Sequence, residues 1–154
     1  MIPNVDDRLA SVVRALTEVI LPHLPPEASL AQEQVELAVG HLQILRAQLD
    51  ALPNYEREEL ADARALGDAL ARCGGGAETS AATAAVSAAA KAKGDDGRAL
   101  LKAINQAIEL LIRAIAVDGD TVSRPLLSAT IITHEQARAQ KDRQWFAPFG
   151  FDTL

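Results

Sequence analysis

The sequence predicts an all-α protein: an antiparallel four-helix bundle with an extra Ala-rich peripheral helix and an aromatic C-terminal tail. Ala and Leu supply most of the 49% hydrophobic content, and both lose little side-chain freedom in a helix. Apolar residues recur three and four positions apart along most of the chain, as on one face of a helix. At 154 residues, we expect residues 1–154 to form a single helical-bundle domain.

The first helix is predicted over residues 5–21, with Asn4 or Asp6 as its cap. Pro22 lacks an amide hydrogen and disfavours helical geometry at Leu21, so the helix should end or kink there. The apolar positions have helical spacing and are Val5, Leu9, Val12, Val13, Leu16, Val19 and Ile20.

The second helix is predicted over residues 29–52, where Ser29 and Gln32 have the spacing of a capping box. Its main apolar stripe is Val35, Ala38, Val39, Leu42, Leu45, Leu49 and Leu52. A second line of Leu30, Leu37 and Ile44 widens the apolar face, which indicates neighbours on two sides.

The third helix is predicted over residues 55–73, with Asn54 as its cap and the glycines of residues 74–76 as its end. The short connection at Pro53 and Asn54 predicts that the second and third helices are antiparallel. Two further helices are predicted, one over residues 98–117 and a last one that Ser123 caps, with Pro125 in its first turn. Residues 133–144 of that helix contain no large apolar side chain.

Residues 77–92 have a different composition, because nine of these sixteen residues are alanine. Alanine favours helix but buries little surface to offset the entropy of ordering. We therefore predict a marginal helix over residues 80–91, within a flexible Ala/Gly-rich excursion that spans residues 74–97.

Several stretches resemble parts of metal, phosphate or catalytic sites, but each lacks residues that such a site needs. Helix-bundle di-metal sites need a Glu three residues before a His, and His23, His41 and His134 have none. The stretch "DGDTVS" lacks the glycine and closing Glu of a calcium loop, and "RCGGGAETS" lacks the lysine of a phosphate loop. Cys73 has no nearby His to activate it. We expect no catalytic residue, no cofactor and no metal, and so a protein that is not an enzyme.

Charge and cysteine content limit the classes of binding partner and the cellular compartment that the sequence predicts. The net charge of −6 argues against a nucleic-acid partner. The single cysteine excludes an intrachain disulfide, and the start of the chain lacks the blocks of a signal peptide. No apolar run is long enough for a membrane span. These features predict a cytoplasmic protein.

The stretch "RLASVVRALTEVILPHLPPEASLAQEQVELAVGHLQILRAQLD", residues 8–50, resembles the opening of small helical bacterial domains of unknown function. Such domains occur near, or fused to, aminoglycoside-phosphotransferase-like proteins and acyl-CoA dehydrogenases. The resemblance carries no catalytic residues, and it implies an accessory role beside a metabolic enzyme as the partner.

Four of the five aromatic residues lie in the tail: Trp145, Phe146, Phe149 and Phe151. Because the preceding twelve residues are polar, the last helix is expected to project past its own core and to present these rings to a partner. The simplest partner is a second copy, so we predict a homodimer. The function predicted is that of a non-catalytic interaction or accessory protein. A bundle that binds a small apolar, acyl-type ligand and an enzyme with an unrecognised site are the alternatives.

Overall fold

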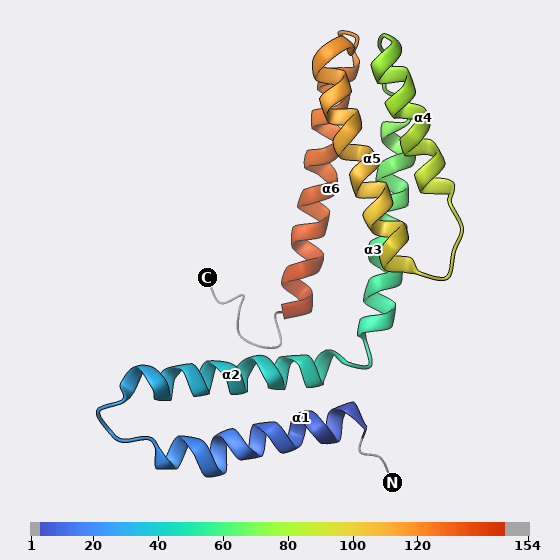
Figure 1. The fold of residues 1–154 in the computed structure, drawn as a ribbon. Coiled ribbons are helices and arrows are strands. Elements are labelled where there is room, and N and C mark those ends of the chain that lie inside the picture. The colour runs from blue at the N-terminus through green and yellow to red at the C-terminus, as the bar shows by residue number, and fades with distance from the viewer. Residues whose placement is uncertain (1–3, 147–154) are drawn as a thin grey trace. The chain divides into compact units, whose positions relative to one another are not determined.

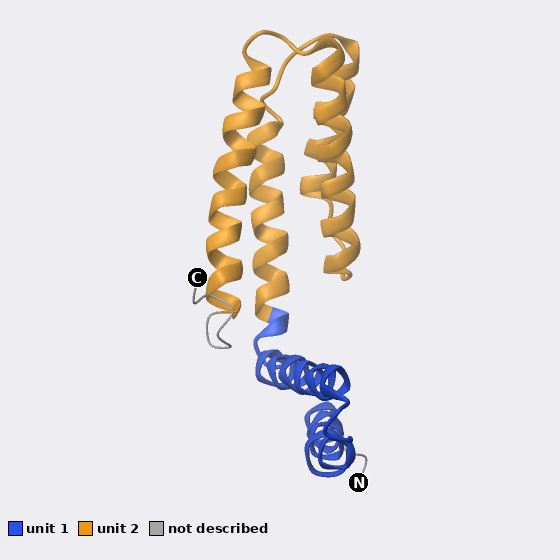
Figure 2. Cartoon of the chain, turned by 90° about the vertical axis from the view of Figure 1, so that its left-hand side faces the viewer, with its two compact units in different colours: residues 1–53 blue, residues 54–154 orange. Residues whose placement is uncertain are grey.

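A computed structural model describes residues 4–146, and every regular element in that range is helical. The all-α prediction is therefore confirmed. The chain divides into two compact units, residues 1–53 and residues 54–154 (Figure 2), where the sequence predicted one bundle domain.

Unit 1 is a hairpin of two antiparallel helical segments (Figure 1). The first comprises α1 (Val5–Arg14), a π-helical stretch (Ala15–Ile20) and a 3₁₀ turn (Leu21–His23). Asn4 caps α1 by accepting a hydrogen bond from the Asp7 amide at 2.8 Å. The helical path ends at His23, one residue beyond Pro22, as expected for a residue without an amide hydrogen.

The second segment of unit 1 is α2 (Ser29–Gln48). The predicted capping box is wrong, because Ser29 is already the first helical residue and its neighbour Ala28 occupies the cap position. The Gln32 amide donates to the Ala28 carbonyl at 3.0 Å, and the Gln32 side chain donates to the Pro25 carbonyl at 3.2 Å. The Gln32 side chain is therefore hydrogen-bonded to the turn before the helix and does not form the predicted capping box.

Unit 2 contains α3 (Leu52–Leu70), whose first two residues fall at the unit boundary, α4 (Ala77–Lys91), α5 (Gly97–Asp118) and α6 (Ser123–Phe146). The α3 helix begins earlier than predicted, with Pro53 in its first turn, where a missing amide hydrogen is tolerated. The core of the unit is built mainly by α5, and its largest fully buried apolar side chains are Leu70, Val86, Ile104, Leu111 and Ile115.

The Ala-rich α4 lies along α5 (Figure 1) and contributes Val86, which has no exposed surface, to the core. The sequence predicted a peripheral helix here, and that expectation is wrong because small side chains allow close approach. A Cβ atom added at Gly67 of α3 would lie only 3.1 Å from the Ala90 Cβ of α4. The small alanine side chains thus allow α4 to pack closely against its neighbouring helices.

Candidate functional site

The two units differ in how completely they bury their apolar residues. Unit 2 has a contiguous core, whereas Val13 and Ile44 are the only buried apolar side chains that the structure describes in unit 1. Seven large apolar side chains of the hairpin have between 43% and 69% of their surface exposed. They are Val5, Val12, Val19, Ile20, Leu30, Leu37 and Leu45. We call this set the hairpin face.

Helical spacing brings these residues onto two stripes. On the first segment, Val5 and Val12 are seven residues apart, and the wider π-helical turn continues the stripe at Val19 and Ile20. On α2, Leu30 and Leu37 are also seven residues apart. Of the second apolar line predicted for α2, Leu30 and Leu37 are exposed, whereas Ile44 is buried.

The two stripes share one side of the hairpin only in part. The helix sides that face each other carry Asp6, Val13 and Arg46, since Arg46 makes a two-pronged ion pair with Asp6 at 2.7 and 3.1 Å and Val13 is buried. Viewed from its own N-terminus, the first segment has Val5 and Val12 roughly a third of a turn anticlockwise from that side. On α2 only Leu45 lies at a similar angle from Arg46, whereas Leu30 and Leu37 lie nearly half a turn away from it. In antiparallel helices, equal rotations seen from the two N-termini lead to the same face.

The opposite side of the hairpin is polar. The first segment presents Asp7, Ser11 and Glu18 there, and α2 presents Glu36 and Gln43. All five are exposed. The hairpin is therefore a two-helix layer with one apolar and one polar side, and a layer of this kind is stable when another layer covers its apolar side.

The structure places two of the four predicted partner-binding aromatics in unit 2. Trp145 packs on Tyr55 of α3 with ring centroids 4.5 Å apart, and Phe146 ends α6 with 41% of its surface exposed. Phe149 and Phe151 lie outside the described residues, so the predicted aromatic hook stays a prediction. The described part of the tail begins with a contact inside its own unit.

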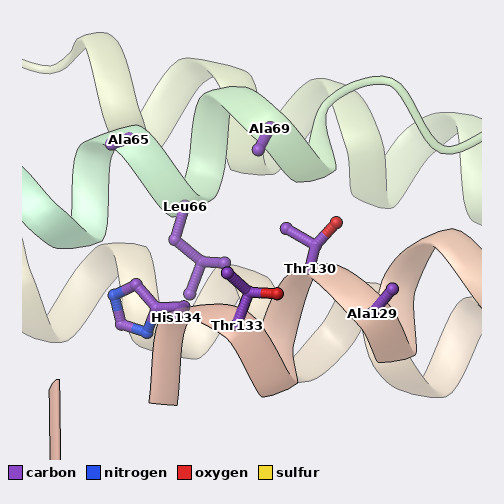
Figure 3. Close-up of a pocket in the computed structure, with 7 residues that line it drawn as sticks. All are labelled: Ala65, Leu66, Ala69, Ala129, Thr130, Thr133 and His134. Carbon is purple, nitrogen blue, oxygen red and sulfur yellow. The ribbon is translucent and has the colours of Figure 1, made fainter. Parts of the chain in front are cut away.

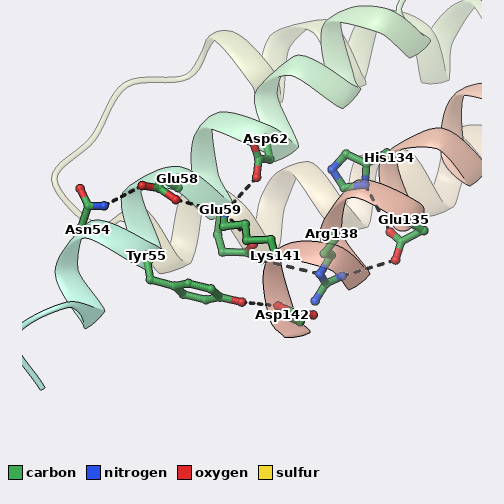
Figure 4. Close-up of polar contacts among 10 residues, drawn as sticks. All are labelled: Asn54, Tyr55, Glu58, Glu59, Asp62, His134, Glu135, Arg138, Lys141 and Asp142. Atoms are coloured by element: carbon green, nitrogen blue, oxygen red, sulfur yellow. Dashed lines mark hydrogen bonds and ion pairs between the residues drawn. The ribbon is translucent and has the colours of Figure 1, made fainter. Parts of the chain in front are cut away.

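The polar half of α6 does not project away from its unit, as the sequence reading expected. It lies beside α3 and is held by charged side chains (Figure 4). Lys141 Nζ is 3.0 Å from Asp62 Oδ2 and 3.2 Å from Glu59 Oε1, and the Tyr55 hydroxyl donates to Asp142 at 2.6 Å. We call these contacts the α3–α6 polar seam.

Electrostatics support the charge states that the polar seam requires. Burial lowers the pKa of Lys141, but the hydrogen bonds to Asp62 and Glu59 more than offset it and the net pKa is raised. Burial, followed by the hydrogen bond to Asp142, raises the pKa of Tyr55. Lys141 stays charged and Tyr55 stays a neutral donor, so these groups hold two helices together and are not poised for acid–base chemistry.

A shallow groove of about 400 Å³ lies between α3 and α6 (Figure 3). Its lining consists of small or apolar side chains and one histidine: Ala65, Leu66 and Ala69 from α3, and Ala129, Thr130, Thr133 and His134 from α6. No charged carboxylate or ammonium group lines it among the described residues. The groove is therefore suited to a slim apolar group.

His134 separates this groove from a cavity of about 60 Å³ lined in part by Glu59, Asp62 and Asn105. Its Nδ1 is 3.3 Å from Glu135 Oε1, while its buried Nε2 has no hydrogen-bond partner within residues 4–146. The cavity has room for about two water molecules, which could satisfy Nε2. Sequence reasoning considered His134 only as a metal ligand, because the groove that it lines forms only where α3 and α6 lie side by side.

The glycine loop at residues 74–76 and the loop at residues 118–120 contact each other. Gly75 and Gly119 form an antiparallel bridge, with the Gly76 amide donating to the Asp118 carbonyl at 2.9 Å. The Asp118 carboxylate accepts from the amides of Glu78 and Thr79, each at 2.9 Å, and from the Thr79 hydroxyl at 2.6 Å. This carboxylate caps α4 from a distant part of the chain. We call the contact the glycine clasp.

The glycine clasp has no space for larger residues. A Cβ atom at Gly75 would lie 2.6 Å from the Asp118 carbonyl oxygen, and one at Gly119 would lie 2.6 Å from the Ile115 carbonyl oxygen. Both distances are shorter than side-chain atoms tolerate. The glycines are thus required for close backbone approach, and the loop reading of these stretches agrees with the structure.

Cys73 lies beside the clasp and is buried. Burial raises the pKa of its thiol, although a hydrogen bond with Ser123 acts in the opposite direction. A thiol with a raised pKa forms little thiolate at neutral pH, so the environment does not activate Cys73 as a nucleophile.

Among residues 4–146, no group of three or more His, Cys, Asp and Glu side chains is arranged to hold a metal ion. Over the same residues, no helix combines the length and the apolar character that crossing a bilayer requires. No protein-family model, curated protein or solved structure matches the chain.

Proposed function

We propose that the protein is a non-catalytic helical interaction protein, and that the hairpin face is the surface through which it binds. The observation that supports this most directly is the exposure of seven large apolar side chains on the hairpin, next to one polar side. Exposed apolar area of this extent on a regular element is typical of association surfaces. Unit 2, acting as an antiparallel four-helix bundle, would be the stable body that carries the hairpin.

The experiment compares complexes formed by the full-length protein and by two variants. Val12→Glu places a charge on the hairpin face, and Ser11→Glu places the same charge on the polar side, one residue away. Native mass spectrometry of tagged protein purified from its own host should show a complex for wild type and for Ser11→Glu that Val12→Glu lacks. Equal complex formation by all three proteins contradicts the proposal.

The aromatic tail is the second proposed contact region. Trp145 contacts Tyr55 inside unit 2, which places the hairpin face ahead of the tail as the main binding surface. Deleting residues 145–154 tests the tail directly, because a tail-mediated homodimer becomes monomeric. A metabolic enzyme, as implied by the resemblance of residues 8–50, is the alternative partner for either surface.

A second function, the binding of an acyl-type ligand, is favoured by the groove between α3 and α6. The groove is lined mainly by Ala, Leu and Thr side chains, and His134 stands at one end. An acyl chain lying along Leu66 would bury apolar surface without requiring a charged partner. Titration with a fluorescent fatty acid should then give saturable binding that Ala69→Trp, which fills the groove, abolishes. Unchanged binding by this variant excludes the groove as the site.

A further inference from the structure

The groove between α3 and α6 leads from an apolar region to a charged one. Its own lining residues carry no carboxylate or ammonium group (Figure 3). Residues three, four and seven apart share one face of a helix, so Asp62 lies on the same face of α3 as Ala65, Leu66 and Ala69. Lys141 of α6 contacts Asp62 at this end. A ligand that lies along the groove therefore meets the α3–α6 polar seam.

Negative charge is in excess around the seam. The residues drawn in Figure 4 include five carboxylates, one histidine, one lysine and one arginine. Lys141 Nζ lies 3.0 Å from Asp62, 3.2 Å from Glu59 and 3.7 Å from Glu58. A single ammonium group is thus shared by three carboxylates.

Arg138 does not restore the balance. Its guanidinium group lies 3.8 Å from Glu59 and 3.9 Å from Glu135, and both distances exceed the ~2.8 Å of a charge-assisted hydrogen bond. Glu135 is itself one of the five carboxylates. The charged end of the groove therefore attracts a cation and repels an anion.

Asp62 is the carboxylate best placed to bind a ligand. Its side chain is 51% exposed, whereas that of Glu59 is only 15% exposed. Lys141 contacts Oδ2 of Asp62, and Oδ1 accepts no hydrogen bond in the described part of the chain. A cationic donor can therefore bind Asp62 without taking Lys141 from it.

The groove determines the shape of the rest of the ligand. The path from Asp62 to Ala69 covers seven residues of α3, or about 10 Å at 1.5 Å per residue. Small side chains line the groove on both helices, and Leu66 supplies a larger apolar surface. A slim, unbranched apolar chain can lie along this path and bury apolar area.

We propose that the groove binds a small amphiphilic amine, with its apolar chain along Leu66 and its ammonium group on Asp62. This step rests on the proposed ligand-binding function of the groove, because it names the head group of the ligand. A carboxylate on the same chain would meet the excess negative charge, so charge selects the amine over the acid.

The test is calorimetric titration of the full-length protein with octylamine, octanoate and octanol, which share one chain and differ in the charge of the head group. Octylamine should bind saturably and on the order of tenfold more tightly than octanoate, since attraction of one head group adds to repulsion of the other. Asp62→Asn keeps the shape of the side chain and should weaken octylamine binding about fivefold, as expected for one partly exposed ion pair. Asp68→Asn makes the same change at an exposed position of α3 outside the groove lining and should bind octylamine like wild type.

The groove-filling variant Ala69→Trp separates this inference from the proposed function. If it abolishes binding of all three compounds while wild type binds octanoate as tightly as octylamine, the groove binds apolar chains and the assigned head group is wrong. Octylamine binding that is equal in Asp62→Asn and Asp68→Asn, or that survives Ala69→Trp, also overturns the inference. If none of the three compounds binds saturably, the ligand-binding function of the groove fails with it. Far-UV circular dichroism checks that each variant is folded.

Discussion

The substitution Thr79→Val tests whether the glycine clasp stabilises unit 2. Thr79 has no exposed surface, and its hydroxyl donates to Asp118 Oδ1 at 2.6 Å. Valine keeps the shape of threonine but replaces the hydroxyl by a methyl group. A hydrogen bond to a charged acceptor contributes about 1.5–3 kcal/mol, so we expect Thr79→Val to lower the free energy of unfolding of unit 2 by about that amount. The remaining two amide donors keep the carboxylate from being left without partners.

The chain provides both a reporter and a matched control for this experiment. Trp145 is the only tryptophan and lies in unit 2, so its fluorescence during urea unfolding follows that unit. Thr83→Val makes the same chemical change one helical turn later, where the hydroxyl donates to the Thr79 carbonyl of its own helix at 2.6 Å and lies 3.3 Å from the Cys73 carbonyl. This control should cost less than about 1 kcal/mol, because the helix already supplies that carbonyl with a donor.

A unit of about 100 residues shifts its melting temperature by roughly 4–8 °C per kcal/mol. Thr79→Val should therefore melt at least about 6 °C below wild type, with Thr83→Val between the two. If Thr79→Val is as stable as Thr83→Val, the hydroxyl makes no net contribution and the clasp is not the cap of α4 that its geometry indicates.

The remaining predictions concern pH, the thiol and one glycine. Hydrogen bonds from Thr79 hold the pKa of Asp118 below its ordinary 3.8. The stability that Asp118 contributes is therefore present above pH 3.8 and is lost as the pH falls through its lower folded-state pKa. In that acidic range, the urea midpoint of wild type should fall more steeply with decreasing pH than the midpoint of Asp118→Asn. Cys73 should react slowly with a thiol reagent in the native protein and quickly in urea, because burial raises its pKa; rapid native labelling contradicts this. Gly40→Ala should stabilise α2 by about 0.5–1 kcal/mol, since no atom lies within 4 Å of the added Cβ; a lower melting temperature would show an unrecognised contact.

Local sequence signals account for the helices and their ends. Asn4 caps α1, and Pro22 precedes the end of the first helical path. Ser123 was predicted as the cap of the last helix, but it is the first residue of α6, and Asp120 accepts a hydrogen bond from its amide at 2.7 Å. Each of these effects depends on backbone geometry and on amide hydrogens within a few residues, which the sequence displays directly. Two boundaries were wrong: α2 ends at Gln48, four residues before the predicted end, and α3 begins at Leu52, three residues before the predicted start.

Contacts between distant segments could not be predicted in the same way. Nothing near Gly76 in sequence indicates that Asp118 supplies the cap of α4, because the two meet only after α5 has packed. The polar half of α6 was predicted to project from its unit because hydrophobic periodicity considers only apolar side chains. In the structure, the polar side chain of Lys141 binds Glu59 and Asp62 on α3. The hairpin face was visible as a wide apolar stripe on α2, but the missing second layer appears only when burial is known.

That missing layer links the stability of the hairpin to its association. Unit 2 has a core centred on Leu111 and Ile115, so its unfolding should not depend on protein concentration. Unit 1 buries Val13 and Ile44 alone among its described apolar residues, and short helices without tertiary packing are marginal in water. If self-association covers the hairpin face, each tenfold rise in protein concentration adds about 1.4 kcal/mol to the stability of the folded unit. Far-UV circular dichroism should then show a melting step that moves upward with concentration while the Trp145 fluorescence transition stays fixed. A single transition, unaffected by concentration in both signals, would mean that the hairpin is stable without a second copy.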